Sequence, residues 1–141
     1  MFDKKFEDRM RLWSEFRSTV ETSADPLGSV INFYKKAPLV SIQADPWDKN
    51  TWPDPWELLY DNQYCNFCII LGICYTLQLT DRFKDTDFKI HICTNTEDSE
   101  VKYLLYVGDN VIGYDMNKVV SKFEIPDSIF FETSYIMPSL Q

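Results

Sequence analysis

The 141-residue chain contains little glycine, a single histidine and few positive charges. Its 14 lysine and arginine residues are outnumbered by 22 aspartate and glutamate residues, and the formal net charge is −8. This balance disfavours nucleic-acid binding, because contacts to a phosphate backbone need clustered cations. The four glycines, at positions 28, 72, 108 and 113, form no glycine-rich phosphate-binding loop.

Long apolar segments are also missing. No run of residues reaches the roughly 18 apolar side chains of a membrane span, and the N-terminal MFDKKFEDRM lacks the apolar centre of a secretory signal. Four cysteines in such a chain are typical of free thiols in a reducing compartment. We therefore expect a cytoplasmic or virion protein without a signal peptide that does not bind membranes.

The composition indicates a folded chain. Hydrophobic residues make up 45% and aromatic residues 16%, which is more than disordered chains carry. The length is sufficient for a hydrophobic core of its own. We divide the chain into an N-terminal helical arm over residues 1–37 and an α+β domain over residues 38–141, which we expect to form one compact unit.

Two helices are predicted in the arm. Apolar and aromatic residues recur at steps of three and four over residues 3–20, so a first helix has one aromatic-rich face. That face either packs on the protein's own core or docks onto a partner. Asp25 and Pro26 supply the N-cap and first-turn proline of a second helix, which ends before Pro38.

Residues 38–53 show little periodicity and contain the turn signals Asp45-Pro46-Trp47 and Trp52-Pro53. Trp47 and Trp52 either cover the core or stack on a ligand. The next residues, Asp54-Pro55-x-Glu57, predict a short helix that begins with a capping box.

The most apolar segment runs from Tyr64 to Leu79 and contains few strongly polar side chains. A helix with almost no polar face belongs in the middle of a fold. Cys65 and Cys68 fall in its first turn, where unpaired backbone N–H groups and the helix dipole favour a thiolate. The segment therefore predicts a central buried helix with two cysteines at its head.

The periodicity changes to two after residue 81. Apolar residues alternate with Lys89, His91 and Cys93, which predicts a strand with one apolar face. Further strands are predicted at residues 101–107, 111–114 and 129–136, with a hairpin turn at Gly108-Asp109-Asn110. Helices followed by antiparallel strands indicate an α+β fold, in which the central helix packs on a C-terminal antiparallel sheet.

The order of these parts resembles the transglutaminase-like superfamily, especially its bacterial cysteine-proteinase branch. The similarity covers a Trp-Pro-x-Pro helix, a cysteine at the head of a buried helix and the antiparallel strands, from about Trp52 to Asp115. It places Cys65 in the position of the nucleophile and Asp115 in that of the residue orienting the histidine. The histidine's own position falls near Val101-Lys102-Tyr103, where this chain has no histidine.

The missing imidazole matters for catalysis. A cysteine peptidase or acyl transferase needs a base within about 3 Å of the thiol, and a lysine with a pKa near 10.4 is a poor proton carrier at neutral pH. His91, on the preceding strand, is either a surface or structural residue or a displaced base. We expect no catalysis. The alternative is a cysteine peptidase or acyl transferase with Cys65 as nucleophile, Asp115 as orienting residue, and His91 or Lys102 as base.

Cys65 and Cys68 also form a C-x-x-C sequence at a helix start, as in dithiol redox proteins. A dithiol redox protein is the third hypothesis. The sequence disfavours it, because a thioredoxin-like fold has a strand directly before the motif, whereas a proline-capped helix precedes it here. A zinc site would need a second pair of ligands at usable spacing, and the sequence offers none. We therefore expect no metal and no cofactor.

The favoured function is a non-catalytic structural or protein-binding component, built on a transglutaminase-like fold that has lost its catalytic histidine. Segments around Trp13, Asp25 and Trp52 are also similar to small proteins of tailed phages, particularly cyanobacterial ones, which implies a virion or assembly role. The expected partners are other proteins, either phage structural proteins or copies of this chain. The candidate anchors are large aromatic side chains: Phe2, Phe6, Trp13, Trp47 and Trp52.

Overall fold

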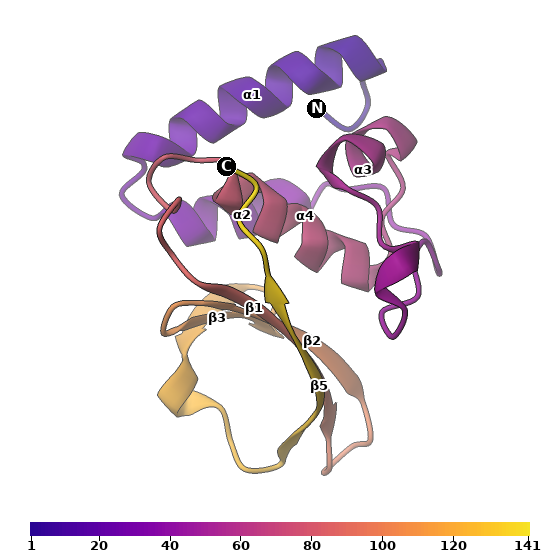
Figure 1. Ribbon diagram of the computed structural model, residues 1–141, viewed down its shortest axis with the longest axis vertical. Coiled ribbons are helices and arrows are strands. Elements are labelled where there is room, and N and C mark those ends of the chain that lie inside the picture. The colour runs from indigo at the N-terminus through magenta and orange to yellow at the C-terminus, as the bar shows by residue number, and fades with distance from the viewer.

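Helices cover one face of a five-stranded antiparallel sheet in the computed structural model, which describes residues 1–141 (Figure 1). The helices are α1 (Phe6–Thr22), α2 (Pro26–Tyr34), α3 (Pro55–Asp61) and α4 (Asn66–Gln78). The strands are β1 (Phe88–Asn95), β2 (Val101–Val107), β3 (Asn110–Asp115), β4 (Lys118–Ser121) and β5 (Ile129–Met137). They lie in the order β4-β3-β2-β1-β5. This arrangement confirms the α+β class expected from the sequence.

Local sequence signals explain where the helices begin. The Asp25 side chain accepts a hydrogen bond from the Gly28 amide, and the first residue of α2 is a proline. Asp54 and Glu57 form the expected capping box at the start of α3. Asn62 then ends α3 in the left-handed region, with φ 51°. These caps satisfy backbone groups that a helix end otherwise leaves unpaired.

Helix α4 lies between α1 and the sheet, with α2 packed beside it (Figure 1). All its residues are buried except Asn66 and Ile69, which confirms the prediction of a helix buried on nearly all sides. Its Thr76 hydroxyl accepts a hydrogen bond from Trp13 Nε1 (3.0 Å) and lies 3.0 Å from the Tyr34 hydroxyl. Although α4 is strongly apolar, neither it nor any other helix is long and apolar enough to cross a membrane.

The main core joins the N-terminal helices to the rest of the chain. Leu27, Val30, Ile31 and Tyr34, which the sequence predicts to face inward from α2, all belong to one buried cluster with Val20 of α1. The same cluster includes most of α4 and the helix-facing residues of β1, β2 and β3. Residues 1–37 therefore pack directly on the α+β part of the chain.

The opposite face of the sheet carries a second apolar cluster, made of Cys93, Leu104, Val111, Val120 and Ile129. The expectation that the His91 and Cys93 side of β1 is a polar face therefore needs correction. The sheet is curved, as Figure 1 shows, so its strands enclose part of this second face. Strand β4, which the sequence did not predict, contributes Val120 to the cluster.

Gly72 allows α4 to pack closely against α2. A Cβ atom at this position would lie 2.6 Å from Tyr34 Cε1. We expect Gly72→Ala to lower the free energy of unfolding by about 1–3 kcal/mol, because the buried Tyr34 ring, which is bonded to Thr76, must shift. Urea denaturation measures this loss. In a double mutant with Tyr34→Leu the two losses should be less than additive, and strict additivity would contradict the proposed clash.

Candidate functional site

Cys65 is the N-cap residue of α4 and has an extended backbone, with φ −81° and ψ 172°. The preceding residue, Tyr64, pairs with the segment that leads into the irregular loop. Its amide donates to the Pro38 carbonyl (3.1 Å), and its carbonyl accepts from the Val40 amide (2.9 Å). Because of this pairing, the loop that follows Val40 runs beside the head of α4.

A pocket with a volume of about 420 Å³ opens over Cys65. Three parts of the chain form it: the loop of residues 41–46, the first residues of α4, and Tyr103 of β2. The Cys65 residue itself is only 5% exposed, so its thiol lies at the bottom of this pocket rather than on an open surface.

The surroundings of Cys65 favour a thiolate. Cys65 makes no capping hydrogen bond to the helix amides, but the Cys68 thiol and the backbone amides of Cys68, Ala44 and Gln43 lie near its sulfur and favour a negative charge there, the Cys68 thiol most strongly. These groups outweigh burial and lower the pKa of Cys65 to about 5. The interaction with Cys65, together with burial, raises the pKa of Cys68. At neutral pH the pair therefore consists of a thiolate at Cys65 and a thiol at Cys68.

The other two cysteines have different environments. Cys74 lies further along α4, where burial raises its pKa and its Sγ donates to Gln78 Oε1 (3.5 Å). Cys93 belongs to the cluster on the opposite face of the sheet, and burial raises its pKa to about 12. All four cysteines are free thiols. Only Cys65 has surroundings that stabilise a negative charge.

Strand β2 brings Tyr103, and not Lys102, to the Cys65 pocket. The Tyr103 ring meets the Phe67 ring edge-on, with 5.2 Å between the centroids. Lys102 points to the opposite face of the sheet, where its Nζ lies 5.7 Å from the centroid of the Tyr114 ring. Burial and the negative charges of Cys65 and Asp45 raise the pKa of Tyr103. A phenol therefore stands where the resemblance would place the catalytic histidine.

The structure does not bring His91 or Asp115 to Cys65. His91 lies on the sheet face away from α4, where its Nδ1 is hydrogen-bonded to Ser134 Oγ (2.6 Å) and its ring stacks on Phe131. Burial and the charge of Lys89 lower its pKa. Asp115 Oδ1 accepts from the Asn117 amide (2.8 Å) in the turn between β3 and β4. The alternative set of Cys65, His91, Lys102 and Asp115 is therefore not assembled.

Most of the five candidate anchors are occupied inside the protein. Trp13 is 3% exposed and bonded to Thr76, so it fills the core and offers no surface to a partner. Trp47 is the most accessible of the five, at 55% exposed. The other three pack on aromatic rings: Phe2 on Phe33, Tyr34 and Tyr64; Phe6 on Tyr60; and Trp52 on Phe67 and Tyr135.

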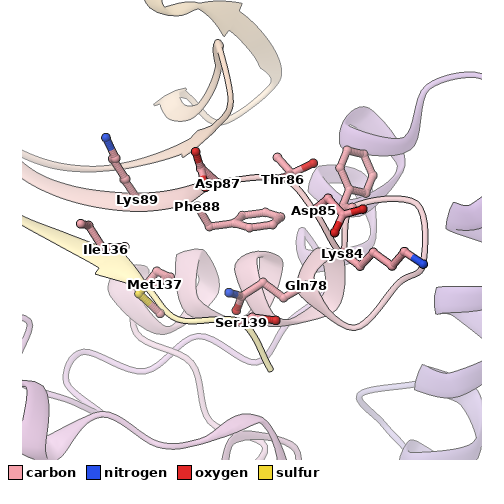
Figure 2. Close-up of a pocket in the computed structure, with 11 residues that line it drawn as sticks. Gln78, Lys84, Asp85, Thr86, Asp87, Phe88, Lys89, Ile136, Met137 and Ser139 are labelled. Carbon is pink, nitrogen blue, oxygen red and sulfur yellow. The ribbon is translucent and has the colours of Figure 1, made fainter. Parts of the chain in front are cut away.

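A second pocket of about 420 Å³ lies at the other end of α4 (Figure 2). Gln78, Phe88, Met137 and Ser139 line its inner part, and its rim carries two lysines and two aspartates from residues 84–89. The Gln78 side-chain amide donates to the Pro138 carbonyl (2.9 Å), so it is already paired. No thiol or imidazole lines this pocket, and it offers less chemistry than the pocket at Cys65.

The sequence identified Cys65 and Cys68 but not the groups that act on them. Gln43, Ala44 and Asp45 come from the irregular loop, where no periodicity marks a functional position. The resemblance left three residues near the position of the family's histidine. The register of the sheet shows which of them faces the pocket, and that residue is Tyr103. Comparison with protein-family models gives no match, and comparison with curated proteins gives none either.

The low pKa of Cys65 should appear as reactivity at acidic pH. At about pH 5.5 the thiolate fraction of Cys65 is about 700-fold larger than that of free cysteine. A thiolate of lower pKa is less nucleophilic, and this lowers the rate constant of the Cys65 thiolate about 40-fold relative to that of free cysteine. We therefore expect alkylation by iodoacetamide to be about twentyfold faster than that of free cysteine at this pH. Rates from intact-mass measurements between about pH 4 and 8 would test this. Alkylation that occurs only after unfolding would contradict it.

Variants of Cys68 provide a matched control. Cys68→Ala removes the thiol that contributes most to lowering the pKa of Cys65, and with it any hydrogen bond from this position to the Cys65 sulfur, so the midpoint of the pH profile should rise. Cys68→Ser retains a hydroxyl donor and should keep the midpoint near that of the unmodified protein. Equal midpoints for the alanine and serine variants would show that a hydrogen bond from this position does not control the pKa.

Proposed function

We propose that this protein performs thiol–disulfide exchange, with Cys65 as the attacking thiolate and Cys68 as the second thiol. The observation that carries the proposal is the position of Cys65 and Cys68 in the first turn of α4, where Cys65 lines a pocket beside the loop residue Ala44 and has a lowered pKa. The thiolate is the nucleophilic form of cysteine, and these surroundings favour it without a histidine.

The missing imidazole limits the leaving groups that the site can expel. An amine leaving a peptide bond needs a proton, which a histidine supplies in cysteine peptidases. The candidate donor in this pocket, Tyr103, holds its proton tightly because its pKa is raised. A thiolate, in contrast, is a stable anion that departs without a proton. The site therefore suits disulfides and thiols better than amides as substrates.

The exchange uses both cysteines in sequence. The Cys65 thiolate attacks one sulfur of a substrate disulfide, the substrate S–S bond breaks, and one substrate thiolate leaves. The mixed disulfide at Cys65 then removes the acceptor and the negative charge that raise the pKa of Cys68. Cys68 loses its proton to solvent and attacks the Cys65 sulfur, and the second substrate thiolate leaves. Two electrons pass to the substrate and a Cys65–Cys68 disulfide forms; the reverse sequence oxidises a substrate dithiol.

The non-catalytic docking role has less support. Four of its five candidate anchors are used in packing within the protein: Phe2, Phe6, Trp13 and Trp52. Trp47 remains available, so a contact with another protein stays a prediction. Membership of the transglutaminase-like superfamily and a place in a phage particle also remain predictions, since neither family models nor curated proteins match the chain.

A small activated disulfide tests the proposed chemistry directly. With dithiodipyridine, the native protein should rapidly release two pyridinethione molecules and end with a Cys65–Cys68 disulfide that carries no pyridyl group. Cys68→Ala should release one molecule and keep a pyridyl adduct on Cys65, because the resolving thiol is missing. Absorbance follows the release, and intact mass identifies the products. A native protein that keeps its adduct as long as Cys68→Ala does would contradict a dithiol function.

A further inference from the structure

The pocket over Cys65 has an exposed apolar rim. Ile42 lines the pocket and is 80% exposed, and Trp47, which follows the pocket residue Pro46, is 55% exposed. Both side chains belong to the same loop, and Ile42 leaves apolar surface in water at the pocket that Cys65 lines. Exposed apolar surface next to a reactive group is typical of a site that contacts an apolar part of its substrate.

The charges around the pocket are negative. Asp45 lines it, and Asp61, whose charge acts on Cys68, accepts a hydrogen bond from Gln43 Nε2 (3.3 Å). No lysine or arginine lines the pocket, and the Cys65 thiolate adds a further negative charge. The whole chain carries a net charge of −8. A field of this sign attracts cationic substrates and repels small acidic ones.

The loop also presents backbone groups to the pocket. No hydrogen bond joins the backbone of Ser41 or Ile42 to another part of the chain. Immediately before them, Val40 is paired with Tyr64, which keeps this part of the loop beside the head of α4. Free N–H and C=O groups on a chain held in this way can pair with a peptide in an extended conformation.

From these three features together we propose that the substrate of Cys65 is an extended, basic polypeptide segment with an apolar residue next to its cysteine. The inference builds on the thiol–disulfide exchange proposed above and specifies its substrate. Ile42 and Trp47 contact the apolar residue, the backbone of Ser41 and Ile42 pairs with the peptide backbone, and the acidic surroundings select positive charge. In the covalent step, the Cys65 thiolate attacks the sulfur of the peptide's cysteine and forms a disulfide with it. The original disulfide of the peptide breaks, and the thiol that was joined to the peptide's cysteine leaves as a thiolate.

A set of short peptides tests this substrate class. Each is a hexapeptide with one central cysteine that carries a pyridyl disulfide, so attack by Cys65 releases pyridinethione. One peptide has leucine beside the cysteine and two lysines; a second replaces the lysines with glutamates, and a third replaces leucine with glycine. At low ionic strength we expect the lysine peptide to react on the order of tenfold faster than the glutamate peptide, with the difference shrinking as salt is added.

A surface variant tests the role of the rim. Ile42→Ser should reduce the preference for the leucine peptide over the glycine peptide, from about fivefold towards equal rates, because the apolar contact is lost. Phe123→Ser is the matched control. Phe123 is equally exposed, at 82%, but lies in the 3₁₀ turn after β4 and does not line the pocket, so its loss should leave every rate unchanged.

Two outcomes separate the possible failures. If the native protein exchanges with dithiodipyridine but reacts equally with all three peptides, the inference about the substrate is overturned while the dithiol function stands. If the native protein does not exchange with dithiodipyridine at all, the proposed function fails and the inference fails with it. A loss of preference in Phe123→Ser as large as that in Ile42→Ser would also overturn the assignment of the rim.

Discussion

The burial of α4 on nearly all sides is the constraint on which the rest of the structure depends. A polar side chain in such a helix must find a partner, because an unpaired buried polar group costs about 1–3 kcal/mol. Each polar group therefore ties a distant segment to the helix. Thr76 bonds to α1 and α2 through Trp13 and Tyr34, Tyr75 donates to Pro53 before α3, and the Gln78 amide donates to Pro138 after β5. Together these contacts set the depth and orientation of the helix.

The same burial explains why one cysteine differs from the others. Cys74 lies deep inside the core, where water is excluded and a charge has no partner. Cys65 lies at the point where the chain enters the helix, next to backbone amides that the helix cannot satisfy. Cys68, one turn further, is near enough to lower the pKa of Cys65 but is itself held neutral by burial and by the neighbouring Cys65. The spacing of the two cysteines and the end of the helix thus create opposite protonation states within a single turn.

Local signals in the sequence predicted much of the fold. Asp25-Pro26, the capping box at Asp54 and the turn at Gly108-Asp109-Asn110 depend only on neighbouring residues, and the structure confirms all three. What the sequence could not supply depends on contacts between distant segments. The amides of Gln43 and Ala44 reach Cys65 through the pairing of the preceding residues with Tyr64, and the curvature of the sheet creates the second apolar cluster. Neither feature leaves a periodic pattern along the chain.

The groups that stabilise the Cys65 thiolate also favour one direction of electron flow in the proposed exchange. They stabilise the form with two separate sulfurs, since a disulfide sulfur carries no negative charge for the amides of Gln43 and Ala44 to solvate. Closing a Cys65–Cys68 bond therefore gives up this stabilisation, and the reduction potential of the pair rises. In the proposed exchange, the oxidised protein therefore accepts electrons readily, whereas the reduced protein donates them less readily. Within the proposed exchange, this favours the reverse sequence, in which a Cys65–Cys68 disulfide oxidises a substrate dithiol, over the reduction of a substrate disulfide.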